Sequence, residues 1–153
     1  MGYKDKTGLR GNLSINHMRA GERINSVDIP NTIMNVGKSV VSAFIGSDIT
    51  GGVAFDYMSI GTSGVAAAAT QTTLGSEQLK VGTAASQTTT TTTNDTATFI
   101  GSFGISGTHA IVEAGIFNAT GADTGSMLAR TTFTALNVIS GDAINATWDV
   151  TVA

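Results

Sequence analysis

The end of the chain has the clearest alternation of hydrophobic and polar positions. Between 144 and 152 every second residue is apolar, and the residues between them are polar. The apolar members are Ile144, Ala146, Trp148, Val150 and Val152. A period of two is typical of a β-strand with one buried side and one side facing solvent. Similar alternation predicts strands at 9–16, 97–105 and 110–117, and we expect Ala110, Val112, Ala114 and Ile116 to point inward.

Other segments complete a count of about seven or eight strands. Residues 24–29 should pair with 9–16 in a hairpin turned at Gly21, and 128–138 with 143–152 across a turn at 140–142. Residues 54–61 are apolar on both faces, which predicts a central strand. For 77–93, which ends in the run Thr88–Thr93, two interpretations stay open. One is a solvated strand or long hairpin arm, and the other is a ribbon paired with a neighbouring chain.

Between 33 and 44 the period changes to that of a helix. The apolar positions are Ile33, Val36, Gly37, Val40, Val41 and Phe44. Their spacing predicts one amphipathic helix at about 32–45, with Asn31 or Thr32 as its N-cap and Gly46 at its end. The predicted fold is therefore all-β: an antiparallel, jelly-roll-like sandwich with this helix packed on it. We expect a single domain in which 1–30 form a basic arm and hairpin and 31–153 form the sandwich.

Composition narrows the classes of function. The chain has 153 residues and no cysteine, which excludes disulfides, thiolate metal sites and thiol catalysis. No apolar stretch is long enough for a membrane span, and no signal peptide is recognisable at the N-terminus. We therefore expect a soluble protein that is made in the cytoplasm and does not contact membranes.

Charge is distributed unevenly. Residues 1–23 contain five basic and two acidic side chains, whereas the rest of the chain contains three basic and nine acidic ones. The basic residues of the arm are Lys4, Lys6, Arg10, Arg19 and Arg23. Such an arm is either a solvated terminus or a segment that docks on an acidic face of a neighbouring copy or partner. We interpret it as a protein interface. Too few charges and aromatic residues are present to favour nucleic acid as the partner.

Catalytic chemistry is not recognisable in the sequence. His17 and His109 are not spaced from a serine, a carboxylate or each other as a triad or metal site would require, so we interpret both as surface or edge residues. Glu113 stands in an apolar strand, and we expect it to pair with Arg130. Trp148 could stack on a sugar, but its parity favours core packing. The sequence predicts neither an enzyme nor a bound cofactor or metal ion.

Two groups of segments resemble small structural proteins of tailed bacteriophages. The first is 55–64, Phe-Asp-Tyr-Met-Ser-Ile-Gly-Thr-Ser-Gly, followed by 73–77, Thr-Leu-Gly-Ser-Glu. The second is 113–118, Glu-Ala-Gly-Ile-Phe-Asn, then 127–130, Met-Leu-Ala-Arg, and the closing strand after Gly141-Asp142. This similarity covers about 100 residues, from the fifties to the end.

The resemblance implies a structural protein of the virion. Related proteins decorate capsids or form head or tail fibres. We expect a capsid decoration (cement) protein that bridges shell subunits, with the major capsid protein or another virion protein as partner and with self-association, as a trimer, on the particle. The alternative is a tail fibre or baseplate adhesion module that binds the host surface.

Overall fold

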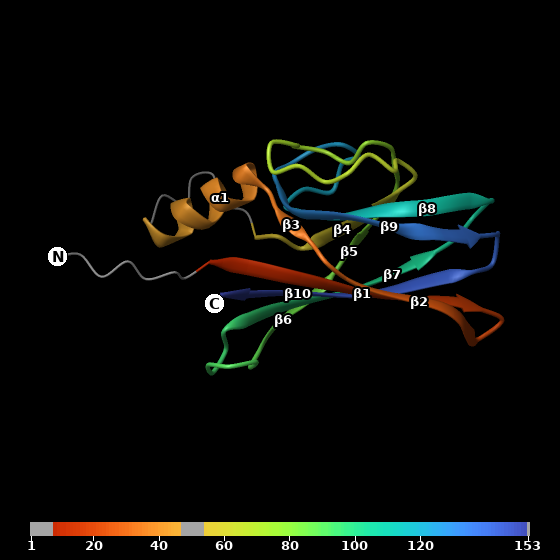
Figure 1. Ribbon diagram of the computed structural model, residues 1–153, viewed down its shortest axis with the longest axis horizontal. Helices are drawn as coiled ribbons and strands as arrows, with labels where there is room; N and C mark the ends of the chain where they lie inside the picture. Colours follow the sequence, from red (N-terminus) through yellow and green to blue (C-terminus); the bar gives the residue numbers. More distant parts are fainter. Residues whose placement is uncertain (1–7, 47–53, 153) are drawn as a thin grey trace.

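The strands form two antiparallel sheets that face each other (Figure 1). The structure is a computed structural model that describes residues 8–46 and 54–152. Sheet A contains, in spatial order, β2 (Glu22–Pro30), β1 (Leu9–Arg19), β10 (Ala143–Val152), β7 (Thr96–Gly104) and β6 (Ala84–Thr88). Sheet B contains β3 (Thr32–Ile33), β9 (Met127–Val138), β8 (His109–Phe117), β4 (Tyr57–Gly61) and β5 (Glu77–Gly82). The predicted antiparallel β-sandwich with one helix is confirmed.

The described residues form ten strands, more than the seven or eight predicted. The additional strands arise because the chain twice changes sheet without a long loop. At Asn31 it passes from β2 in sheet A to β3 in sheet B, and at Thr83 from β5 in sheet B to β6 in sheet A. Such strands make the corners of a sandwich. The two sheets are thereby joined by continuous backbone at Asn31 and at Thr83.

Asn31 fixes the first of these corners. Its backbone N–H donates to the Gly11 carbonyl at 3.1 Å, and its side-chain oxygen accepts the indole N–H of Trp148 at 2.8 Å. A Cβ at position 11 would collide with the Asn31 side chain, which explains the glycine in β1. Trp148 is completely buried, so the predicted core role is confirmed. Asn31 therefore holds the corner and does not cap the helix.

Side chains from both sheets fill one main core. Its largest completely buried members include Trp148, Phe103, Leu13, Ile60 and Ile116. The prediction for β8 was wrong at its beginning, because a β-bulge between Ile111 and Glu113 shifts the parity. Ile111 is buried, whereas Ala110 is exposed. The bulge leaves Glu113 on the opposite side of the strand from Ala114 and Ile116, which belong to the core.

The helix α1 (Asn35–Ile45) is shorter than the predicted 32–45. Thr32 and Ile33 pair with Arg130 and Ala129 of β9, and the extended Met34 precedes the first turn without a side-chain cap. Gly46 ends the helix as predicted. The helix packs against β9 at the end of the sandwich where β10 finishes (Figure 1).

The predicted pairing of 128–138 with 143–152 was also wrong. These segments are β9 and β10, which belong to opposite sheets. The turn between them forms backbone hydrogen bonds with Ile105, the residue after β7. The Gly141 N–H donates to the Ile105 carbonyl at 3.0 Å, and the Ile105 N–H donates to the Asp142 carbonyl at 2.9 Å. The chain therefore crosses between sheets, and β10 pairs with β1 and β7.

Gly37 allows the close approach of α1 to β9. A Cβ at this position would lie 2.6 Å from the Leu128 Cα, so backbone would have to move. Alanine normally stabilises a helix relative to glycine by about 1 kcal/mol, but we expect Gly37→Ala to lower the free energy of unfolding by about 1–3 kcal/mol. At Gly46 the nearest atom would be at 3.5 Å, so Gly46→Ala is the control and should change it by less than about 0.5 kcal/mol. Urea titrations measure the free energy of unfolding of both variants. A Gly37→Ala variant that is more stable than the natural protein would contradict the packing argument.

Candidate functional site

The motif segments converge on one buried ion pair. Glu113 of β8 and Arg130 of β9 have no exposed surface, and the guanidinium donates to one carboxylate oxygen through Nη2 at 2.7 Å and Nε at 3.1 Å. The predicted pairing of these two residues is confirmed. Both residues alternate with core residues of β8 and β9, so their side chains lie on the side of sheet B that faces away from sheet A. The loop that follows β4 runs over this face (Figure 1).

That loop is residues 62–76, here called the anchored loop. Its backbone N–H groups bind the Glu113 carboxylate: Ser63 at 3.1 Å, Gly75 at 3.0 Å and Ser76 at 2.8 Å. Gly61, before the loop, has no room for a Cβ, which would lie 2.5 Å from Glu113 Oε1. The Ile-Gly-Thr-Ser-Gly and Leu-Gly-Ser-Glu motifs thus supply both the small residues and the donors that the carboxylate requires.

Arg130 fixes the far part of the anchored loop. Its remaining bonds go to Gln71 Oε1 at 2.8 Å and the Val65 carbonyl at 2.9 Å. Gln71 Oε1 also accepts the Ala68 N–H at 2.9 Å, so the same side chain holds the run of four alanines, 66–69, in place. Glu113 accepts five hydrogen bonds in a site without solvent exposure. This arrangement fastens a loop and offers no open carboxylate for proton transfer.

Lys80 fastens a second loop, residues 118–126, over the same face of sheet B. Its ammonium donates to the Gly121 carbonyl at 2.6 Å and lies 4.2 Å from the centroid of the Phe117 ring. The Glu77 carboxylate is 3.5 Å away, and both side chains are more than nine-tenths buried. Such a cation over an aromatic ring is favourable when desolvated.

A third cluster contradicts the surface assignment of His17. This residue is only 2% exposed, and its Nε2 lies 2.8 Å from Asp142 Oδ2. Arg19 donates to both Asp142 oxygens at 2.8 Å, and the Ile139 N–H donates at 3.0 Å. Sequence spacing could not reveal this cluster, because His17 and Asp142 are 125 residues apart. His109 forms one long bond to the Ser106 carbonyl at its turn.

Within 77–93 the chain forms the strands β5 and β6, but the threonine run after Thr88 is a turn and not a strand, and the pairing of this segment with a neighbouring chain stays a prediction. Thr88 ends β6, and the following threonines turn around the Asp95 carboxylate. That carboxylate accepts the N–H groups of Thr90, Thr91 and Thr92 at 2.9, 2.9 and 2.7 Å. Consecutive N–H groups pointing at one anion form a backbone nest. A single acidic residue thus closes the β6–β7 connection.

The predicted arm residues do not gather in one place. Lys4 and Lys6 lie outside the described residues. Arg10 is exposed near the start of β1, whereas Arg19 ends that strand about 30 Å away, and Arg23 is exposed on β2. Arg19 is bound to Asp142 and so does not present a free charge. Of the described arm residues, Arg10 and Arg23 remain exposed for contact with a partner.

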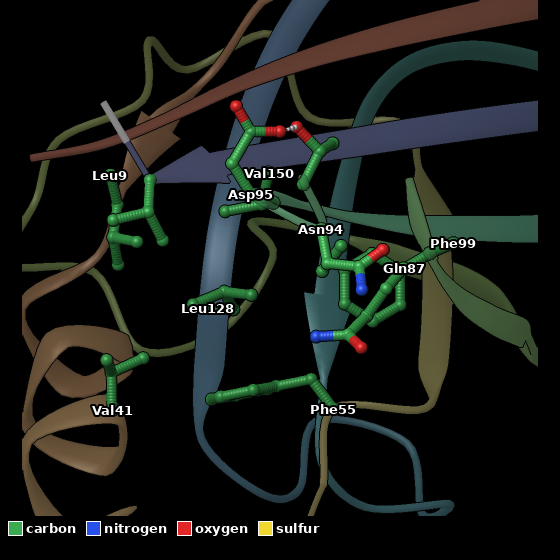
Figure 2. A pocket seen from close by; sticks show the side chains of 12 residues that line it. Leu9, Val41, Phe55, Gln87, Asn94, Asp95, Phe99, Leu128 and Val150 are labelled. Atoms are coloured by element: carbon green, nitrogen blue, oxygen red, sulfur yellow. Dashed lines mark hydrogen bonds between the residues drawn. The ribbon is translucent and has the colours of Figure 1, made fainter. Parts of the chain in front are cut away.

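A cavity of about 250 Å³ lies between the sheets, at the end near α1 (Figure 2). Its lining is mainly apolar and comes from both sheets, the helix and the segment before β4. Leu9, Val41, Phe55, Phe99, Leu128 and Val150 are among the apolar members. The amides of Gln87 and Asn94 also face it. The cavity can accept an apolar group. Its lining also includes the Thr96 hydroxyl, which donates to Asp95 Oδ1 at 3.1 Å, but that carboxylate is already bound by the N–H groups of the threonine turn.

Residues 8–46 and 54–152 contain no cluster of three or more histidine or acidic side chains placed to hold a metal ion. Within the same ranges, no helix has the length and hydrophobicity needed to cross a bilayer. Comparison with protein-family models, curated proteins and solved structures finds no match for this chain.

Removing Arg130 should cost far more than removing an exposed cation. Arg130→Met leaves Glu113 buried and unpaired, so we expect the free energy of unfolding to fall by about 3–5 kcal/mol. The double variant Glu113→Gln, Arg130→Met removes the unpaired charge and should recover part of that loss. Urea unfolding measures both, with Lys38→Met on the exposed face of α1 as control. A loss in Arg130→Met no greater than in the control would contradict a structural role for the pair.

Stability should fall in acid because of Asp142 and Asp95. Hydrogen bonds from Arg19, and then from His17, hold the pKa of Asp142 well below its usual range. The N–H groups of Thr92 and Thr90 do the same for the pKa of Asp95. A lowered folded pKa contributes stability that is present above the unfolded value of about 3.9 and is lost as pH falls below it.

We therefore expect the urea midpoint to fall between about pH 4 and pH 2, less steeply in Asp142→Asn or Asp95→Asn than in the natural protein. Asp123→Asn, in the exposed part of loop 118–126, is the matched control. Equal acid slopes in the natural protein and in both test variants would refute the assignment of these two carboxylates.

Proposed function

We propose that this protein is a structural protein of a bacteriophage particle, a capsid decoration protein that stabilises the head by bridging shell subunits. The proposal rests on the resemblance of its motifs to small virion proteins. The observation that carries it further is the convergence of those motifs on the Glu113–Arg130 pair. Residues as many as 65 positions apart in sequence form one unit, so the similarity of these segments has a physical reason in the fold.

The use of charge supports a structural function. Among the described residues, Glu113, Arg130, Lys80, Asp95 and Asp142 each fasten a loop or turn. Enzymes instead keep perturbed acid or base groups in a cleft that substrate can reach. A body whose loops are held in this way suits a protein that transmits force between neighbours, and we propose that it is not an enzyme.

The connections support a jelly-roll-like interpretation of the sandwich. The last two strands lie beside the first ones in each sheet, since β10 pairs with β1 and β9 pairs with β3. Together with two backbone corners, this order ties the N-terminal hairpin to the closing strand. The first and last strands of each sheet are thus hydrogen-bonded to each other, which supports the proposal of a body that keeps its shape between neighbouring subunits.

Attachment would be mechanical and multivalent. Each copy would make modest contacts with the major capsid protein or another virion protein and with other copies, for which the resemblance to virion proteins leads us to expect a trimer. Many weak contacts repeated over a lattice give an avidity that no single one supplies. Arg10 and Arg23 are exposed at different ends of the β1–β2 hairpin, so they could reach two separate acidic surfaces.

Occupancy on particles tests the proposal. Labelled protein added to phage heads that lack it should be seen by electron microscopy as regular copies over the shell. Replacing both Arg10 and Arg23 by Glu should lower occupancy about tenfold or more at moderate salt, as two lost charge contacts of about 0.7 kcal/mol or more each would require. Lys38→Glu, which reverses an exposed charge on α1, should bind normally.

The location of the copies separates decoration from the alternative function. Copies confined to the tail tip would reject decoration and favour a tail fibre or baseplate module. Binding that the double glutamate variant and a chain without residues 1–8 both retain in full would remove the basic arm from the proposal. Absence of the protein from purified virions would reject the virion assignment altogether.

A further inference from the structure

In the part of the chain that the structure describes, 8–46 and 54–152, one edge strand lacks the usual protection against pairing. β6 ends sheet A, and β7 is its only hydrogen-bonded strand neighbour among the described residues. All five β6 residues, Ala-Ala-Ser-Gln-Thr, are exposed. They include neither charge nor proline, the features by which edge strands normally avoid pairing with other chains. The pairing with β7 is regular and has no bulge to twist the edge away.

The other three edges differ. β2 includes Glu22, Arg23 and Asp28 and ends at Pro30, whose nitrogen cannot donate a hydrogen bond. β5 contains the Glu77–Lys80 ion pair, and β3 has only two residues. Protection is thus present at each edge that is long enough to need it, with β6 as the exception. An edge without such protection is open to pairing with a strand of another chain.

Both ends of β6 are fixed, so the edge is prepared for a partner. Before it, the Thr83 N–H donates to the Asp56 carbonyl at 2.8 Å. After it, the threonine turn closes on Asp95, and Thr88 Oγ1 bonds Thr98 Oγ1 at 2.8 Å. An edge held in its extended form loses little further conformational entropy when another strand binds.

We propose that β6 pairs with β6 of a second copy across a two-fold axis, which would join two A sheets into one. Antiparallel pairing centred on Ser86 sets Ser86 opposite its own copy, Ala85 opposite Gln87 and Ala84 opposite Thr88. A two-fold contact repeats each side chain close to itself, so a charge in this strand would meet a like charge. The uncharged sequence satisfies that condition. A two-fold axis beside β2 would place Pro30 among the hydrogen-bonded pairs, although its nitrogen has no hydrogen to donate.

The inference rests on the proposed structural function, in which copies touch one another, and it names the surface they use. It differs from the expected trimer, because a strand pair closes after two copies. Lys replacements on the two exposed edges distinguish the contact. Ser86→Lys should convert a dimer of the 15.5 kDa chain into a monomer in sedimentation equilibrium, whereas Asn25→Lys on β2 should not.

Cysteine cross-linking tests the register directly, since the natural chain has no cysteine. Facing residues of antiparallel strands have Cα atoms about 4.5–5.5 Å apart, within the range of a disulfide. Under mild oxidation Ser86→Cys should give a covalent dimer within minutes. Ala84→Cys and Thr88→Cys should cross-link when mixed but not separately, and Ser26→Cys on β2 should stay monomeric.

Three results would overturn the inference. They are a natural protein that sediments as a monomer at all concentrations, a larger assembly that Ser86→Lys leaves intact, and Ser86→Cys that cross-links no faster than Ser26→Cys. Head binding is measured separately with the cross-linked dimer. A protein that cross-links as described but does not bind heads would keep the strand pairing and lose the decoration function, so the two failures are distinguishable.

Discussion

The Glu113–Arg130 ion pair is the interaction that holds the anchored loop on the outer face of sheet B. Neither group has access to water, and a charge in that position is tolerated only when its partners satisfy it completely. The partners are the backbone N–H groups of the anchored loop and the side chain of Gln71. The loop and the pair therefore require each other. Without the loop the charges would be left exposed on sheet B. Without the charges the loop would keep the packing of Leu74 against Phe117 and Met127 but would lose the hydrogen bonds of Ser63, Gly75 and Ser76.

The same device recurs in smaller form around the molecule. Loops rich in Gly, Ala, Ser and Thr bury little apolar surface, so hydrophobic packing cannot repay their ordering entropy. A single charged group that collects several backbone donors or acceptors can do so, because charge-assisted hydrogen bonds are stronger than neutral ones. Lys80 acts in this way on loop 118–126, Asp95 on the threonine turn and Asp142 on the turn before β10. The low content of charged residues is consistent with their specialised placement.

Periodicity predicted most of the sandwich because one face of most strands is buried. It failed where tertiary contacts override local pattern. The bulge between Ile111 and Glu113 reversed the parity at the start of β8, and pairing with β9 kept Thr32 and Ile33 extended and delayed the helix. The pairing of Glu113 with Arg130 was predictable, since an isolated carboxylate in an apolar strand needs a cation. His17 with Asp142 was not, because residues 125 apart meet only through the order of strands. The order of strands depends on which sheet the chain enters after each crossing. An alternation of period two looks the same for strands of either sheet, so it does not predict that order.

The crossings have a further consequence for assembly. Because the chain changes sheet at Asn31 and at Thr83, each side of the sandwich has edge strands that belong to different sheets but to one continuous stretch of backbone. An edge at such a corner cannot slide independently of the neighbouring sheet. Any chain that pairs with β6 would therefore be connected through Thr83 to β5 and β4, and from there to the Glu113 site. The path from this edge to the buried ion pair thus consists of the backbone at Thr83 and of consecutive hydrogen-bonded strands.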